Sequence, residues 1–133
     1  MENGIIELLK ISSQYLSEHG VESPRLDAEV LLADVLNTDR IGLYVNYDRP
    51  VSKEELSRYR TYIARRAQRI PVAYITGRKE FMSVDFCVED GVLIPRPDTE
   101  VLIDETVKFL NSRSLRAPKV LDLCTGTGAI ACS

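Results

Sequence analysis

Residues 78–97, RKEFMSVDFCVEDGVLIPRP, divide the chain into a helical half and a differently patterned second half. Apolar residues at positions 81, 84, 86 and 88 alternate with polar or small ones, a period typical of a β-strand. The letters EDG then indicate a turn, and VLI indicates a second strand. Pro95 and Pro97 end this strand because proline cannot donate to a ladder. We therefore expect a β-hairpin linker over 78–97.

The residues before this hairpin are patterned as a small helical bundle. Apolar residues recur at helical spacing from Ile5 to Leu16, and Gly20 follows as a C-terminal cap. In the segment ESPRLDAEVLLADVLN, Ser23 suits the N-cap and Pro24 the first helical position. The residues of this second helix that we expect to face a core are Leu26, Val30, Leu31, Val35 and Leu36.

Two further helices complete the expected bundle. A short one falls within DRIGLYVNY, and a longer one begins at a capping box, Ser52 to Glu55, and runs to Pro71. The short connections predict antiparallel neighbours. The chain is therefore expected to be mainly α, with a first domain over 1–77.

Composition narrows the classes of function. The chain has 133 residues, 44% hydrophobic and 28% charged, and no apolar run is long enough for a membrane span. Its start, MENGIIELLK, does not resemble a signal peptide, so we expect a cytoplasmic protein without membrane association. The three cysteines form no C-x-x-C pair and His19 is the only histidine, so no metal site is expected.

The net charge of −3 argues against general affinity for nucleic acid, although it allows a local basic surface. No RNA-binding motif surrounds the tyrosines, and direct nucleic-acid binding is not expected. Basic residues do gather on the fourth helix and its exit. They form either a solvated helix face or a docking surface for an acidic protein or RNA. These residues are Arg58, Arg60, Arg65, Arg66, Arg69, Arg78 and Lys79.

The region 98–133 is patterned as the start of an α/β domain. A helical pattern returns in DTEVLIDETVKFLNSR, and Val120–Leu123 is apolar enough for a buried parallel strand. A glycine-rich turn and a new helical segment follow, an arrangement that lets the backbone approach a ligand closely. The residues expected on the core face of the first of these helices are Val101, Leu102, Thr106 and Phe109.

The glycine-rich turn allows more than one interpretation. The letters GTGAIA fit G-x-G-x-x-G/A, which favours a dinucleotide site and hence a nicotinamide-dependent oxidoreductase. That alternative needs an acidic ribose ligand about 20 residues further on, beyond Ser133. A glycine turn that binds no ligand is the other alternative.

Four segments together resemble a known family. VLDLCTGTGAIA is similar to motif I of class I S-adenosylmethionine-dependent methyltransferases. ESPRLDAEVLLADVL, RIPVAYITGRKEF and GVLIPRPDTEVLID resemble, in this order and spacing, the release factor glutamine methyltransferases, and IPRPDTE is the most specific of these pieces. The resemblance implies a helical substrate-recognition domain, a hairpin and a Rossmann-like catalytic domain. It also implies methyl transfer from S-adenosylmethionine to the glutamine amide nitrogen in the Gly-Gly-Gln motif of peptide chain release factors.

The same resemblance assigns part of a cofactor site. Asp122 would orient the loop, or simply satisfy amides at a strand end. Arg96 would be aimed at the cofactor or the first catalytic-domain helix, or would pair with Asp98 or Glu100. Cys124 stands where the family usually has glycine, so a positive φ there would disfavour binding. The loop residues expected to approach S-adenosylmethionine are Cys124, Thr125, Gly126, Thr127 and Gly128.

The family's catalytic segment, Asn-Pro-Pro-Tyr, does not occur in the sequence. We therefore expect the chain to be an N-terminal portion, truncated within motif I, that lacks methyltransferase activity and at most binds release factors. A strand at 120–123 would lack parallel neighbours, so residues beyond about Ala117 are expected to be disordered or paired with another chain. Nothing in the sequence indicates an oligomeric state.

Overall fold

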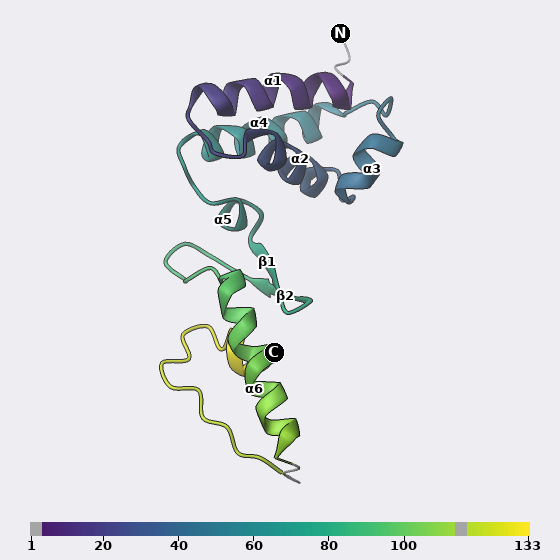
Figure 1. The fold of residues 1–133 in the computed structure, drawn as a ribbon. Helices are drawn as coiled ribbons and strands as arrows, with labels where there is room; N and C mark the ends of the chain where they lie inside the picture. Colours follow the sequence, from purple (N-terminus) through teal and green to yellow (C-terminus); the bar gives the residue numbers. More distant parts are fainter. Residues whose placement is uncertain (1–3, 114–116) are drawn as a thin grey trace. The chain divides into compact units, whose positions relative to one another are not determined.

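The computed structural model describes residues 4–113 and 117–133, which divide after Thr76 into two compact units (Figure 1). Residues 1–3 of the expected helical domain and 114–116 of the expected α/β region 98–133 lie outside the described residues. Within the described ranges, no helix combines the length and the apolar character needed to cross a lipid bilayer.

The first unit is the expected helical bundle. Its helices are α1 (Ile5–Glu18), α2 (Pro24–Val35), α3 (Arg40–Val45), α4 (Lys53–Ala67) and α5 (Val72–Thr76). α2 packs against each of the other four, and α1 and α4 also contact one another (Figure 1). No sequence pattern considered above predicts α5.

Local signals set most of the helix ends. The predicted capping box is present: Ser52 Oγ accepts from the Glu55 amide at 3.1 Å, and Glu55 Oε2 accepts from the Ser52 amide at 2.8 Å. Ser23 occupies the N-cap of α2, but its side chain makes no capping hydrogen bond. The prediction that the fourth helix runs to Pro71 is wrong, because α4 ends at Ala67 and Arg69 takes a left-handed φ of 68°.

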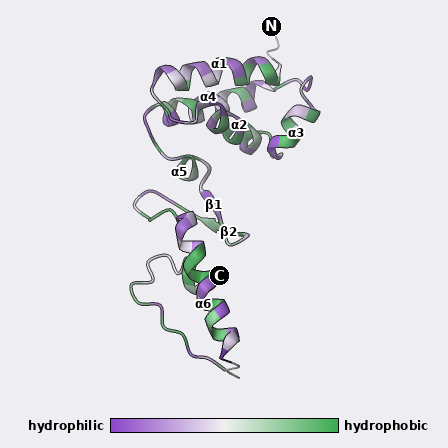
Figure 2. Cartoon of the chain, in the orientation of Figure 1, coloured by the Kyte–Doolittle hydropathy of each residue, from purple (hydrophilic) through white to green (hydrophobic). Residues whose placement is uncertain are grey.

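The core of the bundle is apolar and continuous. Figure 2 shows apolar and polar residues sharing each helix, as expected for helices buried on one side. Leu26 is wrongly predicted as a core residue, since it is exposed, whereas Leu31, Val35 and Leu36 are buried. The buried core residues are Ile5, Leu8, Leu9, Leu16, Val21, Ala28, Leu31, Leu32, Ala33, Val35, Leu36, Leu43, Tyr59, Ile63 and Ile75.

The second unit begins with the hairpin, but its turn lies elsewhere than predicted. β1 (Arg78–Phe81) pairs antiparallel with β2 (Val84–Cys87), with Phe81 opposite Val84. The two-residue turn, Met82 and Ser83, has φ values of 50° and 61°, the handedness that suits a hairpin. The run 92–94 is not a strand. Because the turn at Met82 and Ser83 is shorter than the predicted turn at EDG, residues 84–87 form the second strand in place of 92–94.

Helix α6 (Pro97–Ser112) is present, but a different face is buried from the one predicted. Val101, Leu102 and Phe109 are more than half exposed, while Ile103 is buried. Ile103 packs in a small cluster with Phe81 of the hairpin and Ala129, flanked by Met82 and Phe86. Because α6 packs against these residues, the side of the helix that contains Ile103 is buried. The prediction that Val101, Leu102 and Phe109 face the core is therefore wrong.

The strand expected at 120–123 is not formed. These residues are irregular, and Val120, Leu121 and Leu123 are each about two-thirds or more exposed. A strand needs a partner, and in the described residues β1 and β2 pair only with each other. The chain then turns through the glycine loop into the short helix α7 (Ala129–Cys132).

Candidate functional site

A pocket of about 410 Å³ in the second unit brings together two segments that are separate in the sequence. The first precedes and begins α6, and the second is the glycine loop. Five of the seven predicted site residues line it: Arg96, Cys124, Thr125, Gly126 and Thr127. The remaining lining residues are Phe81, Gly91, Val92, Leu93, Pro95, Thr99, Ala129 and Ile130.

The loop backbone alternates in handedness. Cys124, Gly126 and Gly128 have φ values of 61°, 57° and 76°, and the residues between them do not have positive φ. Alternating backbones of this kind turn successive N–H groups toward one concavity, which suits an anionic group. An added Cβ on Gly126 would have only the Cys124 carbonyl oxygen nearby, at 3.9 Å. Glycine is therefore favoured at this position by the positive φ and not by a lack of space.

Cys124 adopts a positive φ of 61°, the conformation that would disfavour cofactor binding at this position. A side chain in this conformation costs about 1–2 kcal/mol relative to an ordinary backbone conformation. Cys124 is exposed and has a free thiol. The loop therefore carries backbone strain at the position where glycine would relieve it.

Gly128 and Asp122 lie outside the pocket lining. The Gly128 amide donates to the Thr125 carbonyl at 2.9 Å and closes the loop, and Thr127 Oγ1 accepts from the Ala129 amide at 3.3 Å. Asp122 lies in a second hollow of about 410 Å³, beside Leu102 and Ile103 of α6. Its Oδ2 atom is buried and has no hydrogen-bond partner among the described residues.

Arg96 is the N-cap residue of α6, in extended conformation between its two prolines. The alternative in which it pairs with Asp98 or Glu100 is not formed among the described residues. Glu100 instead accepts a hydrogen bond from the Met82 amide at 3.0 Å, which ties α6 to the hairpin turn. Sequence reasoning missed the pocket role of residues 91–95, because it assigned them to a turn and strand. The two prolines that end an extended run were the available signal.

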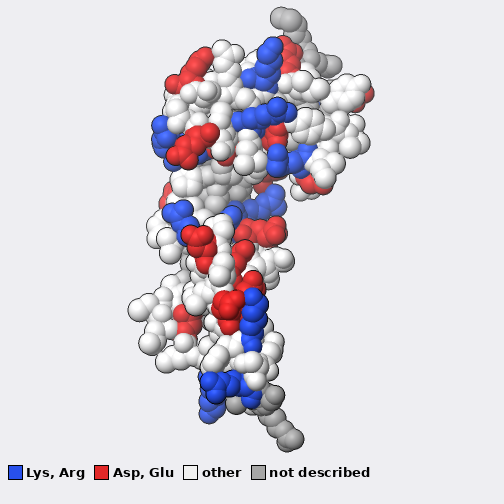
Figure 3. All heavy atoms as spheres, in the orientation of Figure 1, with Lys and Arg blue, Asp and Glu red and all other residues white. Residues whose placement is uncertain are grey.

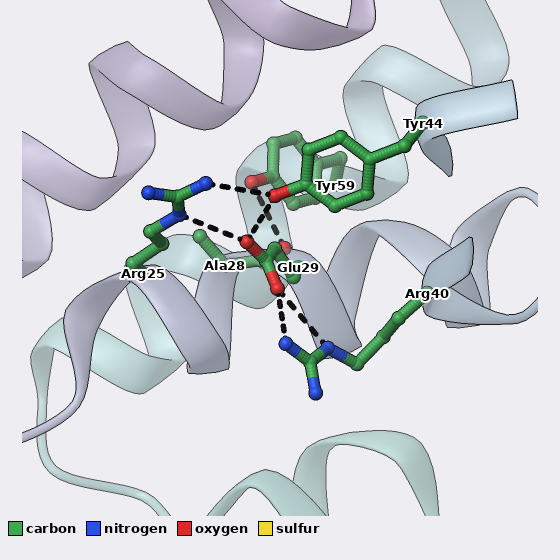
Figure 4. A network of polar contacts seen from close by, with 6 residues as sticks. All are labelled: Arg25, Ala28, Glu29, Arg40, Tyr44 and Tyr59. Carbon is green, nitrogen blue, oxygen red and sulfur yellow. Dashed lines mark hydrogen bonds and ion pairs between the residues drawn. The ribbon is translucent and has the colours of Figure 1, made fainter. Parts of the chain in front are cut away.

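The helical unit contains a second polar constellation, centred on Glu29 of α2. Figure 4 shows Arg25 and Arg40 approaching its carboxylate from opposite sides, with Tyr44 also donating to it. Arg25 Nε donates to Oε1 at 3.0 Å, and Arg40 donates to Oε2 through Nε at 3.0 Å and Nη2 at 2.5 Å. Arg25 Nη2 also donates to the Tyr44 hydroxyl at 3.1 Å. The sequence offered one signal, the four-residue spacing of Arg25 and Glu29.

Glu29 and Tyr59 are among the groups of the helical unit whose pKa values are clearly perturbed. Burial acts to raise the pKa of Glu29, but hydrogen bonds from Tyr44, Arg40 and Arg25 outweigh it, so the pKa lies below its ordinary value. Burial raises the pKa of Tyr59 to about 12. The Tyr59 hydroxyl donates to the Ala28 carbonyl at 3.3 Å. Glu29 is therefore held as a carboxylate and Tyr59 as a neutral phenol.

The basic surface expected on the fourth helix is partly internal. Arg66 Nε donates to Asp27 Oδ2 at 2.6 Å, and Arg66 Nη1 donates to the Ile70 carbonyl at 3.1 Å. Both side chains of this ion pair are largely buried, so Arg66 joins α4 to α2 rather than facing a partner. On the face drawn in Figure 3, basic and acidic side chains are interspersed over the bundle.

Comparison with known proteins adds to these observations. The model of the family described as "PrmC N-terminal domain" matches residues 7–77, more than half of the chain. The chain belongs to this family.

Three relatives illustrate the similarity, each named release factor glutamine methyltransferase. The chain is 47% identical to the protein of Geobacter sulfurreducens over 127 residues, which cover 96% of this chain and 43% of that protein. It is 44% identical to the Leptospira interrogans protein over 131 residues (98% and 46%). It is 40% identical to the Rhodopirellula baltica protein over 129 residues (96% and 44%). The chain thus spans less than half the length of these relatives, and none of their names supports the oxidoreductase alternative.

Proposed function

We propose that the whole protein is a methyltransferase that acts on peptide chain release factors in the cytoplasm. It transfers a methyl group from S-adenosylmethionine to the side-chain amide nitrogen of the glutamine in their Gly-Gly-Gln motif. The observation that carries the proposal is the pocket at the glycine loop, in a chain whose relatives have this name. The predicted loop residues Cys124 to Thr127 and the remote residue Arg96 line that one pocket.

The pocket suits one end of the cofactor. The alternating loop backbone would receive its carboxylate, and the apolar walls, which include Leu93 and Ile130, would exclude water. Arg96 would supply a positive charge at the pocket edge, and Gly128 would keep the loop closed. Asp122, with an unpaired buried oxygen, would accept from an amine or amide donor in the completed site. When bound, S-adenosylmethionine supplies a methyl group attached to a sulfonium.

A binding measurement tests the cofactor site. We expect Gly126→Ala to weaken S-adenosylmethionine binding, measured by titration calorimetry, because a side chain disfavours the positive φ of the pocket loop. Gly77→Ala is the matched control: Gly77 also has positive φ, 75°, and open space around it, but it lies outside the pocket lining. Equal affinities for the two variants would contradict the assignment.

We also propose that this chain alone has no methyltransferase activity and that its helical unit acts as a release-factor-binding module. An amide nitrogen is a weak nucleophile that has to be oriented by acceptors. The segment that supplies these acceptors in the resembling family, Asn-Pro-Pro-Tyr, is not in the sequence. Labelled cofactor and purified release factor test the activity of the whole protein and the inactivity of this chain: label on the Gly-Gly-Gln glutamine is expected with the whole protein and not with this chain. Label transfer by this chain, or none by the whole protein, would refute the corresponding statement.

A further inference from the structure

The short helix α3 exposes most of its apolar surface. Ile41 and Val45 are 72% and 70% exposed, and they lie on the same side of the helix, four residues apart. Tyr44 is also exposed, while Leu43 is fully buried in the core. One leucine thus anchors α3, and the three remaining large apolar or aromatic side chains of the helix face solvent. Apolar groups gathered in this way mark interaction sites more often than scattered single residues do.

A hollow of about 450 Å³ adjoins this helix and extends the exposed surface to α2. Its lining includes Leu26 and Tyr44, both exposed, together with Arg25, Glu29 and Arg40. Tyr44 belongs both to the hollow and to the exposed side of α3, so the two are continuous. We call this surface the α3 patch. Its residues are Arg25, Leu26, Arg40, Ile41, Tyr44 and Val45.

The charge that the α3 patch presents to solvent is positive. The side chains of Arg25 and Arg40 are 76% and 52% exposed, whereas that of Glu29 is 4% exposed. The buried carboxylate lies between the two guanidinium groups, compensates one positive charge and fixes both in place through hydrogen bonds (Figure 4). The neighbouring Asp39 is exposed and keeps its negative charge at the N-terminus of α3, where its Oδ1 accepts from the Gly42 amide at 2.7 Å. A held pair of guanidinium groups is well suited to bind a carboxylate.

We propose that the α3 patch docks a protein segment in which an apolar side chain is flanked by a carboxylate. This inference rests on the proposed function and identifies the partner as the release factor. The apolar residue would pack on Ile41, Tyr44 and Val45, and the carboxylate would bind Arg25 and Arg40. A second copy of this chain is a poorer occupant, because a two-fold contact through the patch would bring its like-charged arginines together.

Calorimetric titration of the 133-residue chain with purified release factor tests the proposal. The double variant Ile41→Ser/Val45→Ser is expected to bind about tenfold or more weakly, since it removes the central apolar contacts. Ile6→Ser/Ile11→Ser is the matched control, because these isoleucines of α1 are also about half exposed, and it should bind within about twofold of the original chain. Thermal unfolding followed by circular dichroism shows that each variant is folded.

A second pair of variants tests the charge. Arg25→Gln should weaken binding about threefold or more and reduce its dependence on salt, whereas Lys10→Gln, on exposed α1 surface, should leave both unchanged. Equal binding by all variants would overturn the α3 patch while leaving release-factor recognition intact. No binding by the original chain would overturn recognition by this chain, and the patch with it. A concentration-dependent dimer that Ile41→Ser/Val45→Ser dissolves would show that the occupant is a second copy, against the proposal.

Discussion

The buried hydroxyl of Tyr59 makes the stability of the helical bundle depend on pH in the alkaline range. Tyr59 is almost fully buried among α1, α2 and α4, and burial raises its pKa to about 12 from an ordinary value of 10. The folded chain therefore keeps this proton at pH values where the unfolded chain releases it. Stability from this group is fully present below about pH 10 and is lost as the pH rises toward 12.

The size of the effect follows from the shift. Two pKa units correspond to about 3 kcal/mol, of which about half is lost by pH 11. At neutral pH, Tyr59→Phe should instead destabilise the bundle by about 1 kcal/mol, because it removes the hydrogen bond to the Ala28 carbonyl. The two stability curves should therefore cross near pH 11, above which the phenylalanine variant is the more stable.

Urea unfolding followed by far-UV circular dichroism, at intervals from pH 7 to pH 11.5 and with a reductant present, measures this crossing. Tyr47→Phe is the control, because Tyr47 is exposed and its loss should leave the pH dependence unchanged. A constant difference between Tyr59→Phe and the original chain across this range would refute the reasoning, since it would mean that the hydroxyl ionises equally in the folded and unfolded states.

Three further substitutions have defined outcomes. Glu29→Gln should lower the free energy of unfolding by about 1–3 kcal/mol in urea at pH 7. The Glu29 carboxylate has a lowered pKa, so it stabilises the fold above its ordinary titration range, and this stability is lost as the pH falls through the lowered value. The variant should therefore lose less stability on acidification than the original chain. Ser52→Ala should cost about 1 kcal/mol by removing the cap of α4, whereas Ser57→Ala within that helix should change little in the same assay. Cys124→Gly should tighten S-adenosylmethionine binding by up to about thirtyfold in calorimetry by relieving the positive φ, and Cys132→Ser should leave it unchanged.

Helices α1 to α4 of the bundle could be predicted because their signals are local. The capping box at Ser52, the proline at the start of α2 and the helical spacing of Ile5 to Leu16 act within a turn or two of the chain. Glu29 could not be placed in this way. A carboxylate counts as polar in any pattern, and its burial depends on Arg40 and Tyr44, which reach it only after α3 has folded back onto α2.

The errors in the second unit have the same origin. Nothing in the α6 sequence states which of its two apolar sides the hairpin covers, so the face containing Val101 and Leu102 was predicted where Ile103 is buried. The turn at Met82 and Ser83 contains none of the glycine or asparagine residues that usually announce a positive φ. The loop around Gly126 was recognisable for the opposite reason, because its glycines do announce its backbone.

These contrasts separate the two proposed roles physically. The core of the bundle is built from residues between Ile5 and Ile75, and the Arg66–Asp27 ion pair, which joins α4 to α2, also lies within the first unit. The candidate cofactor pocket draws only on residues between Phe81 and Ile130. A substitution at Glu29 or in the α3 patch should therefore act on partner binding and bundle stability, and one at Gly126 or Cys124 on cofactor binding. Because additivity holds for sites without shared partners, the two sets of variants should combine independently, and a coupling between them would have to arise from contacts beyond those that build either unit.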